Sequence, residues 1–224
     1  MCNLEESSWD VISNVSRSGL ASNTWNINDR KNITINGERC EFAIMDFDTY
    51  NVVDWATYGR AKNCITFGMV NCMSTTNRMN LDDTNKGGWG ASEMKQTCNG
   101  FTLDSALSNV LVYCKIPYCK EYNSTSPSYD TDSKLFLPSF AEVFGNVSYA
   151  QKPRAEEGSQ FAYYANDDAQ NTRKKKTVSG SPNLWWLRSP RGEGNNGYCA
   201  TTGNGSTYWN QSSYRYGCSP CFCV

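Results

Sequence analysis

The C-terminal segment, residues 184–224, constrains the fold more than any other part of this chain. It begins with an apolar run at 184–187 and ends with another at 221–224. Between them, residues 191–219 contain no Val, Ile, Leu, Met or Phe and consist mostly of Gly, Asn, Ser, Thr and Tyr. Short apolar runs are typical of buried strands, whereas a stretch without aliphatic side chains cannot form a core. We therefore expect residues 191–219 to be displayed on the surface between two anchoring strands.

The composition of residues 191–219 is typical of a binding surface. Tyr and Trp offer large rigid contact areas, and Ser, Gly and Asn offer adaptable hydrogen bonds, as in antibody binding loops. A loop without a binding role is the alternative, because Gly, Asn and Ser are also common in loops. Exposed aromatic side chains favour binding. The predicted ligand-binding residues are Asn195, Asn196, Tyr198, Asn204, Ser206, Tyr208, Trp209, Asn210, Ser212, Tyr214 and Tyr216.

Length and charge exclude several classes of protein. A chain of 224 residues suits one domain, so we predict a single domain over residues 1–224. A net charge of -1 provides no basic field for nucleic acid. No apolar run approaches the length of a transmembrane helix, and residues 1–6 contain no hydrophobic signal core. We expect neither a nucleic-acid partner nor membrane insertion.

The absence of His from the sequence limits the possible chemistry. It removes the commonest general base, the Ser-His and Cys-His nucleophile pairs, and most catalytic zinc sites. Close acidic pairs remain, such as Asp46 with Asp48 and Glu156 with Glu157. Adjacent acids usually lie on a solvated turn, and no spacing marks a calcium loop. The sequence therefore predicts no catalytic residues, no metal site, no cofactor and no enzyme activity.

The chain contains 11 cysteines, an odd number. Without an export signal, free thiols are the default. Two clusters have spacings that could ligate a metal: Cys114 with Cys119, and Cys218 with Cys221 and Cys223. Strand alternation would place Cys221 and Cys223 on one face, which favours packing over ligation. We expect most of the cysteines to be small buried apolar residues.

The N-terminal part predicts a helix followed by a hairpin. Ser7 or Ser8 can cap a helix that ends at Gly19. Asn36-Gly37 lies between two alternating runs, which is the strongest short-range signal for a β-hairpin. The predicted core positions in this part are Trp9, Ile12, Val15, Ile33, Ile35, Phe42 and Ile44.

The rest of the chain predicts a mixed α+β order. We expect a strand at 64–69, a break at 87–90, a short helix at 91–96, a helix from 102 to 110 and a strand at 134–138. Residues 121–133 and 166–183 have loop compositions. The basic run 173–176 could touch phosphate, but a solvated loop tip is favoured. Hairpin, helices and later strands together predict an α+β domain.

A C-terminal signature gives the chain a resemblance. Trp186-Leu187-Arg188-Ser189-Pro190, then a variable stretch and a terminal Gly-x-x-Pro-x-Phe-x-Val, resembles a bacterial and phage domain family of unassigned activity. That family is similar to C-type-lectin-fold proteins. Further landmarks are Asn80, Gly87-Gly88-Trp89, Ser92, Met94-Lys95, residues 134–137 and Glu142-Val143. The chain departs from the usual pattern at Cys218, Ser219 and Cys221.

This resemblance implies a fold and a function. The implied fold is a C-type-lectin-like α+β domain with two helices and small antiparallel sheets, its N- and C-terminal strands near one another. Some relatives are variable proteins of diversity-generating retroelements, in which an error-prone reverse transcriptase rewrites adenines in a C-terminal repeat. Asn codons can then become Ser, Gly, Tyr, Thr, Asp or Cys codons, and residues 191–219 look like such a product.

The implied function is hypervariable receptor recognition through the C-terminal surface. The partner would be a protein or glycan on a target cell, and the location a phage virion or bacterial surface within a larger assembly, else the cytoplasm. One alternative is a fixed-specificity phage fibre tip or adhesin that binds sugar. An enzyme that uses carboxylates or a thiol is another; formylglycine-generating enzymes share the fold class, but their cysteine arrangement is not matched here.

Two expectations concern the anchoring strands. We predict Trp186 and Phe222 to be core residues, because they lie in the only apolar runs of the C-terminal region. Arg188 is flanked by apolar strand residues. A buried guanidinium needs a charged partner, so we predict that Arg188 forms a structural ion pair beneath the surface rather than a ligand contact.

Overall fold

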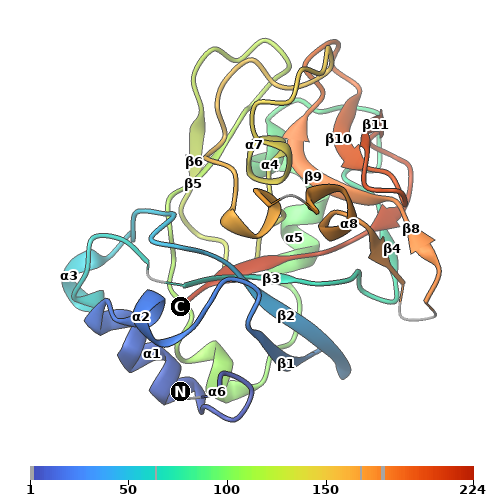
Figure 1. Ribbon diagram of the computed structural model, residues 1–224. Helices are drawn as coiled ribbons and strands as arrows, with labels where there is room; N and C mark the ends of the chain where they lie inside the picture. The colour runs from blue at the N-terminus through green and yellow to red at the C-terminus, as the bar shows by residue number, and fades with distance from the viewer. Residues whose placement is uncertain (1–2, 64, 167, 178–179) are drawn as a thin grey trace.

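The computed structural model describes residues 3–63, 65–166, 168–177 and 180–224 (Figure 1). Within them the chain forms short helices and several small sheets, so it belongs to the mixed α+β class, as predicted. The helices are α1 (Trp9–Ser18), α2 (Ala21–Thr24), α3 (Trp55–Tyr58), α4 (Gly88–Ala91), α5 (Glu93–Asn99), α6 (Ser105–Ser108), α7 (Phe140–Phe144), α8 (Ala169–Thr172) and the 3-10 helix η1 (Ala162–Tyr164).

A four-stranded sheet joins the two ends of the chain. Its strands are β1 (Arg30–Ile35), β2 (Glu38–Phe47), β3 (Ile65–Met69) and β13 (Cys221–Cys223), in the order β1-β2-β3-β13. All three pairings are antiparallel. The N- and C-terminal strands therefore share one sheet, and Figure 1 shows β13 reaching it from the opposite end of the molecule.

The N-terminal elements form as their sequence predicts. Ser8 caps α1 by accepting a hydrogen bond from the Val11 amide, and Gly19 ends the helix with φ 75°. Asn36 and Gly37 both have positive φ, 51° and 76°, which a two-residue type I′ hairpin requires. The predicted strand at 64–69 is confirmed over β3, and Cys64 lies outside the described residues.

Aromatic packing around Phe222 forms the centre of this part of the core. The Phe222 ring stacks on Phe67 at a centroid distance of 5.1 Å and meets Phe42 at 5.3 Å. Trp9 of α1 packs edge-on against Phe222 at 6.0 Å. Phe222 is fully buried, which confirms its predicted place in the core. The last strand of the chain therefore holds the first helix and the first hairpin together.

A five-stranded sheet occupies the other half of the molecule. Its strands are β4 (Thr76–Asn77), β9 (Trp185–Pro190), β10 (Gly197–Thr201), β11 (Thr207–Gln211) and β12 (Tyr216–Gly217), in the order β11-β10-β9-β12-β4. The β12–β9 pairing is parallel, so the expectation of small antiparallel sheets is wrong at this pairing. The expected two helices are also wrong, because the described residues form α1 to α8 and η1. Two small sheets pair β5 (Ile116–Tyr118) with β6 (Ser128–Asp130), and β7 (Lys175–Lys176) with β8 (Pro182–Asn183).

Several local predictions are wrong because tertiary contacts override local propensity. The expected break at 87–90 contains α4, whose Gly88 lies so close to the residue after β5 that an added Cβ would be 1.8 Å from the Cys119 carbonyl. The predicted helix 102–110 shortens to α6, capped by Asp104. The predicted loops 121–133 and 166–183 contain β6, and α8, β7 and β8. The predicted strand 134–138 makes a single bridge, between Phe136 and Cys221.

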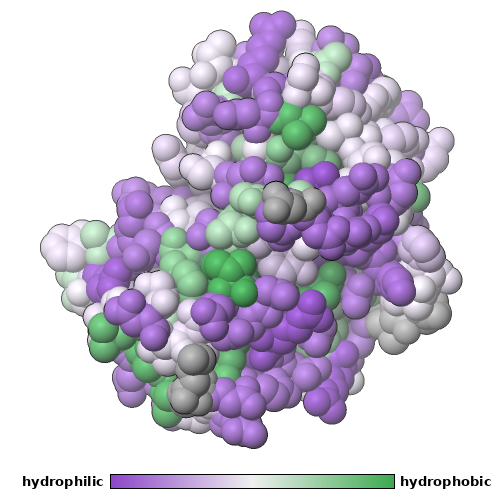
Figure 2. All heavy atoms as spheres, viewed as in Figure 1, coloured by the Kyte–Doolittle hydropathy of each residue, from purple (hydrophilic) through white to green (hydrophobic). Residues whose placement is uncertain are grey.

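The exterior is polar. Figure 2, drawn from the same side as Figure 1, shows a largely hydrophilic surface with small hydrophobic groups, some of them over α1 and α2. This agrees with a mean hydropathy of -0.60. Within the described part of the chain, no helix has both the length and the apolar character needed to cross a bilayer.

Candidate ligand-binding surface

Strand β9 is the structural base of the candidate surface. It lies between β10 and β12, and all six of its residues are buried. Trp185 and Trp186 are fully buried, and their indole N–H groups donate to the carbonyls of Arg173 and Asn77 at 3.0 and 2.9 Å. The prediction that Trp186 is a core residue is therefore confirmed. A central strand with satisfied polar groups gives the outer strands a rigid support.

Arg188 forms the predicted ion pair inside the molecule. It is fully buried, and its Nη1 and Nη2 donate to the two carboxylate oxygens of Glu142 at 2.6 and 2.5 Å. The remaining N–H groups donate to the carbonyls of Pro117, Leu137 and Glu157. Burial alone would lower the pKa of Arg188, but the charge of Glu142 outweighs that effect and raises it. Arg188 therefore has a structural role, as predicted.

A second carboxylate lies beside this ion pair. Glu157 is buried, accepts a hydrogen bond from the Cys119 amide at 2.6 Å and another from the Ser189 hydroxyl. Burial raises its pKa to about 7, and Arg188 offsets this only in part. The expectation that adjacent acids lie on a solvated turn therefore holds for exposed Glu156 and is wrong for Glu157. Glu157 comes from the segment between α7 and η1, which a sequence pattern cannot place beside β9.

The hairpin β10–β11 carries the candidate surface to the edge of the sheet. Tyr198 pairs with Asn210 and Ala200 with Tyr208 in an antiparallel register. Strand β10 is buried throughout, whereas β11, as the edge strand, is half-buried or exposed at every position. The expectation of two anchoring strands around a displayed segment is therefore refined: the segment contains an interior strand of its own.

The hairpin tip packs against α8. Gly205 has φ 83°, and an added Cβ would lie 2.1 Å from the Gln170 carbonyl. Gln170 also donates to the Asn204 carbonyl at 3.1 Å, and Arg173 Nε donates to the Gly205 carbonyl at 3.0 Å. The tip is thus held by residues of the 166–183 segment, which lies next to the predicted surface rather than forming a separate one.

Nine of the eleven predicted ligand-binding residues have side chains that reach solvent. Their positions range from clearly exposed to half-buried on the five-stranded sheet and its loops. Exposed are Asn195, Asn204, Tyr208 and Tyr214, and half-buried are Asn196, Ser206, Trp209, Asn210 and Tyr216.

Two predicted ligand-binding residues lie in the interior, so their expected exposure is wrong. Tyr198 is fully buried, because it lies on β10 between β9 and β11. Ser212 is also buried, and its hydroxyl donates to the Thr84 carbonyl at 2.7 Å. The Ser212 carbonyl in turn accepts hydrogen bonds from the amides of Met79 and Asn80 at 2.9 and 3.2 Å. Both residues support the surface from below.

Tyr214 and Tyr216 on this surface are held by contacts with neighbours. The Tyr216 ring packs on Trp186 at 4.7 Å, and Tyr214 lies 6.3 Å from Tyr216. Asn210 donates to the Tyr216 hydroxyl. Contacts of this kind fix side-chain rotamers before a ligand arrives, which lowers the entropy lost on binding.

Arg191 is a member of the surface that sequence reasoning missed. Its guanidinium lies 3.4 Å from the centroid of the Trp209 ring, and its amide donates to the Gly197 carbonyl at 2.9 Å. Arg stacks on aromatic faces and is enriched at interfaces. Its position directly after β9 was the available signal, but only the register of β10 and β11 places it against Trp209.

Metal-ligating groups, thiols and acidic pairs were the other candidates for chemistry. In the part of the chain that the structure describes, no group of three or more His, Cys, Asp or Glu could hold a metal ion. The described cysteines are buried and free, as predicted for most of them, and Cys2 and Cys64 lie outside the described residues. Burial raises the pKa of Cys72 and Cys221 to about 12, which disfavours the reactive thiolate. Asp46 and Asp48 line a polar pocket of about 580 Å³ with lysines 62 and 115.

The basic run 173–176 is only partly a solvated tip. Lys175 is fully buried, and its ammonium donates to the carbonyls of Met69 and Val70. It also lies 4.9 Å from the Trp185 ring centroid. Burial lowers the pKa of Lys175 to about 8. The expectation of a solvated run is therefore wrong at Lys175, because β7 turns this side chain inward.

The comparisons with known proteins give one match. Residues 62–224 match the model of a family described as "Domain of unknown function (DUF6273)". The matched region contains β3 and all of the five-stranded sheet, whereas β1 and β2 precede it. No curated protein and no solved structure matches the chain.

Proposed function

This chain belongs to the DUF6273 family, and we propose that it is a ligand-binding protein whose C-terminal surface recognises a receptor on a target cell. The proposed fold is C-type-lectin-like, and the proposed origin of the surface is rewriting by a diversity-generating retroelement. The sheet that β1, β2, β3 and β13 share supports the fold, because it brings the two ends of the chain together. The partner would be a protein or a glycan, and the protein would act on a phage virion or bacterial surface.

One observation carries the proposal. The exposed aromatic and amide groups lie on the β10–β11 hairpin and on the segments directly before and after it, whose backbone is held by buried strands, buried Tyr198 and buried Ser212. Tyr208 and Tyr214 are 37% and 49% exposed, which is more than a packing role requires. Rigid aromatics on a preorganised backbone suit recognition, because they bind with little loss of conformational entropy.

A fixed-specificity sugar-binding module is the second candidate. It is favoured by the mutual contacts on the surface: Arg191 stacks on Trp209, and Asn210 donates to Tyr216. Independent rewriting of Asn210 would remove the hydrogen bond to Tyr216, so a diversified surface would contain few such pairs. The same pairs are useful in a surface that always binds one ligand.

The DNA around the coding region separates the two candidates. Retroelement diversification requires a reverse-transcriptase gene nearby and a near-identical, adenine-richer copy of the segment that encodes residues 191–219. Independent isolates should then differ mainly at the codons of exposed residues and retain Tyr198 and Ser212. If isolates share one sequence over this segment and no second copy exists, fixed specificity replaces diversification.

Binding itself is tested with the purified protein on arrays of glycans and of cell-surface proteins. The expected result is a ligand whose signal is lost when Tyr208 and Tyr214 are both replaced by Ala. A matched control replaces exposed Tyr129, far from this sheet in sequence and 58% exposed, with Ala. A signal that survives the double replacement would place the binding site elsewhere. A signal that is lost with Tyr129→Ala would place it near Tyr129.

A further inference from the structure

A pocket of about 420 Å³ lies at the other end of the molecule from the candidate surface. Its walls come from α1, from the segment leading into α3, and from residues 111–113 and 131–132. In Figure 1, α1 and α3 lie at the lower left, whereas β10 and β11 lie at the upper right. None of its lining residues belongs to residues 191–219, so the proposed receptor-binding role does not use it.

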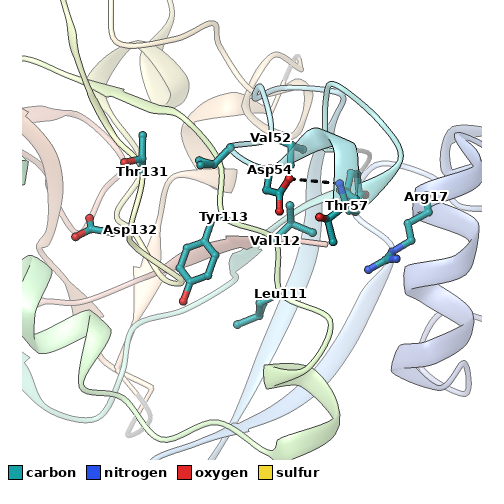
Figure 3. Close-up of a pocket in the computed structure, with 11 residues that line it drawn as sticks. Arg17, Val52, Asp54, Thr57, Leu111, Val112, Tyr113, Thr131 and Asp132 are labelled. Atoms are coloured by element: carbon teal, nitrogen blue, oxygen red, sulfur yellow. Dashed lines mark hydrogen bonds between the residues drawn. The ribbon is translucent and has the colours of Figure 1, made fainter.

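The floor of the pocket is apolar. Val52 and Tyr58 are buried, Leu111 and Val112 are half-buried, and Tyr113 is 42% exposed. Figure 3 shows Val112 and Leu111 at the centre of the close-up with Tyr113 beside them. Pockets of a few hundred Å³ with apolar walls and a few polar groups are typical small-molecule sites.

Two opposite charges face this floor. Arg17 extends from α1 toward Val112 and Leu111, and Asp54 lies on another side of Val112 (Figure 3). The Arg17 guanidinium lies 5.4 Å from the Tyr58 ring centroid. One Asp54 oxygen accepts a hydrogen bond from the Thr57 amide at 3.3 Å and so caps α3.

Neither charge is neutralised by a described neighbour. Within residues 3–63, 65–166, 168–177 and 180–224, Arg17 and Asp54 form no ion pair. The third charged group of the pocket differs, because Asp132 forms an ion pair with Lys95 at 2.6 Å. The pocket thus offers one cation and one anion that a ligand could match.

We propose that this pocket binds a short free peptide with apolar side chains. Its C-terminal carboxylate would pair with Arg17, and its N-terminal ammonium would pair with Asp54. Its side chains would cover Leu111, Val112 and Tyr113. A neutral apolar ligand would leave both charges unmatched, and a fatty acid would leave Asp54 unmatched. Only a ligand with both charges and an apolar body satisfies all three features.

Calorimetric titration with Leu-Phe tests the proposal, using three further forms: N-acetylated, C-amidated and doubly blocked. Each block should weaken binding about tenfold, which corresponds to the loss of one charged contact. Arg17→Gln should weaken the binding of free Leu-Phe, and amidation should then have no further effect on the affinity. Asp54→Asn should abolish the effect of acetylation, while Asn retains the cap on α3.

Matched controls are Arg39→Gln and Asp82→Asn, which remove exposed charges outside the pocket. Both should leave the affinity for Leu-Phe unchanged, and thermal melts should show that all four variants fold. No detectable binding of Leu-Phe at millimolar concentration would overturn the proposal. Equal affinity for the doubly blocked peptide would also overturn it, because the site would then accept an internal protein segment rather than a free peptide.

Discussion

Strand β9 and the β10–β11 hairpin are adjacent in sequence and in one sheet, yet they use polar side chains in opposite ways. In β9, Arg188 and Ser189 are fully buried, and their partners are interior groups that include the carboxylates of Glu142 and Glu157. In the hairpin, Asn204 and Tyr208 face solvent. Position in the sheet explains the difference: β9 has a strand on each side, whereas β11 is an edge.

This difference teaches where the chain can tolerate change. A polar group in β9 must keep its partner, because an unmatched buried charge costs several kcal/mol. A polar group on the exposed side of β11 loses only contacts with water and neighbours. Residues 191–219 include positions of both kinds: Tyr198 and Ser212 belong to the interior and should tolerate little change, whereas the exposed positions should tolerate more.

The largest expected effect is the loss of Arg188. Arg188→Ala leaves the Glu142 carboxylate buried without its cation, so we expect the free energy of unfolding to fall by about 5 kcal/mol, the upper end for a broken buried pair. Urea titration measures this. The control Arg39→Ala removes an exposed pair with Glu5 at 3.9 Å and should cost less than about 1 kcal/mol. Equal losses in the two variants would show that the interior pair is not needed.

Truncation of the core anchors should follow closely. Trp186→Ala and Phe222→Ala each remove a fully buried ring, so each should cost about 3–5 kcal/mol. Trp55→Ala is the matched control, because Trp55 is 60% exposed. Thermal melts of both core variants that coincide with the melt of the parent would contradict the anchoring role.

Much of the fold follows from local signals, and the reason differs from element to element. Helix α1 and the β1–β2 hairpin are confirmed, because Ser8, Gly19 and Asn36-Gly37 specify their own turns and caps. The ion pair of Arg188 was predictable in kind, since an apolar strand cannot leave a guanidinium unmatched. Its partner in the ion pair was not, because Glu142 lies 46 residues earlier in the chain and reaches Arg188 only through tertiary folding.

The candidate site was predictable in composition and not in burial. A segment without aliphatic residues does not reveal that Tyr198 lies on an interior strand, because Tyr can fill a core or bind a ligand. Strand alternation would have distinguished buried Tyr198 from exposed Tyr208 only if the pairing register of β10 and β11 had been known. Lys175 illustrates the same limit, since its stem and ammonium are buried against Trp185 and two carbonyls within a basic run.

A smaller effect distinguishes the interior through its pH dependence. The folded-state pKa of Glu157, about 7, is above its unfolded value near 4.5. A raised pKa means that its favourable contribution is complete below about pH 4.5 and is lost as pH rises through about 7. The shift corresponds to about 3 kcal/mol. Glu157→Gln stays neutral over this range; its Oε1 can accept from the Cys119 amide, and its Nε2 can donate to the Ser189 hydroxyl. Relative to the parent, the variant should therefore gain about 3 kcal/mol in unfolding free energy as the pH rises from 4.5 to 8.

Urea titrations across that pH range measure the gain of Glu157→Gln. The neighbouring Glu156→Gln is the matched control, because Glu156 is exposed and should leave the pH profile unchanged. If the profiles of both variants run parallel to that of the parent, Glu157 titrates normally, and the interior around Arg188 is more hydrated than its geometry indicates.

The smallest expected effect on stability belongs to the exposed residues of the candidate surface. Replacing Asn195, Asn204, Tyr208 and Tyr214 together with Ala should change the unfolding free energy by no more than about 0.5 kcal/mol per site, because these side chains face solvent. The same replacement should abolish binding of the ligand found by array screening, with the tyrosines contributing about 2 kcal/mol or more. Tyr198→Ala, from the same segment, is the contrast, since truncation of this buried ring should cost about 3–5 kcal/mol. A fourfold variant that melts as early as Tyr198→Ala would mean that the hairpin is structural on both faces, and the distinction between β9 and the edge of the sheet would be lost.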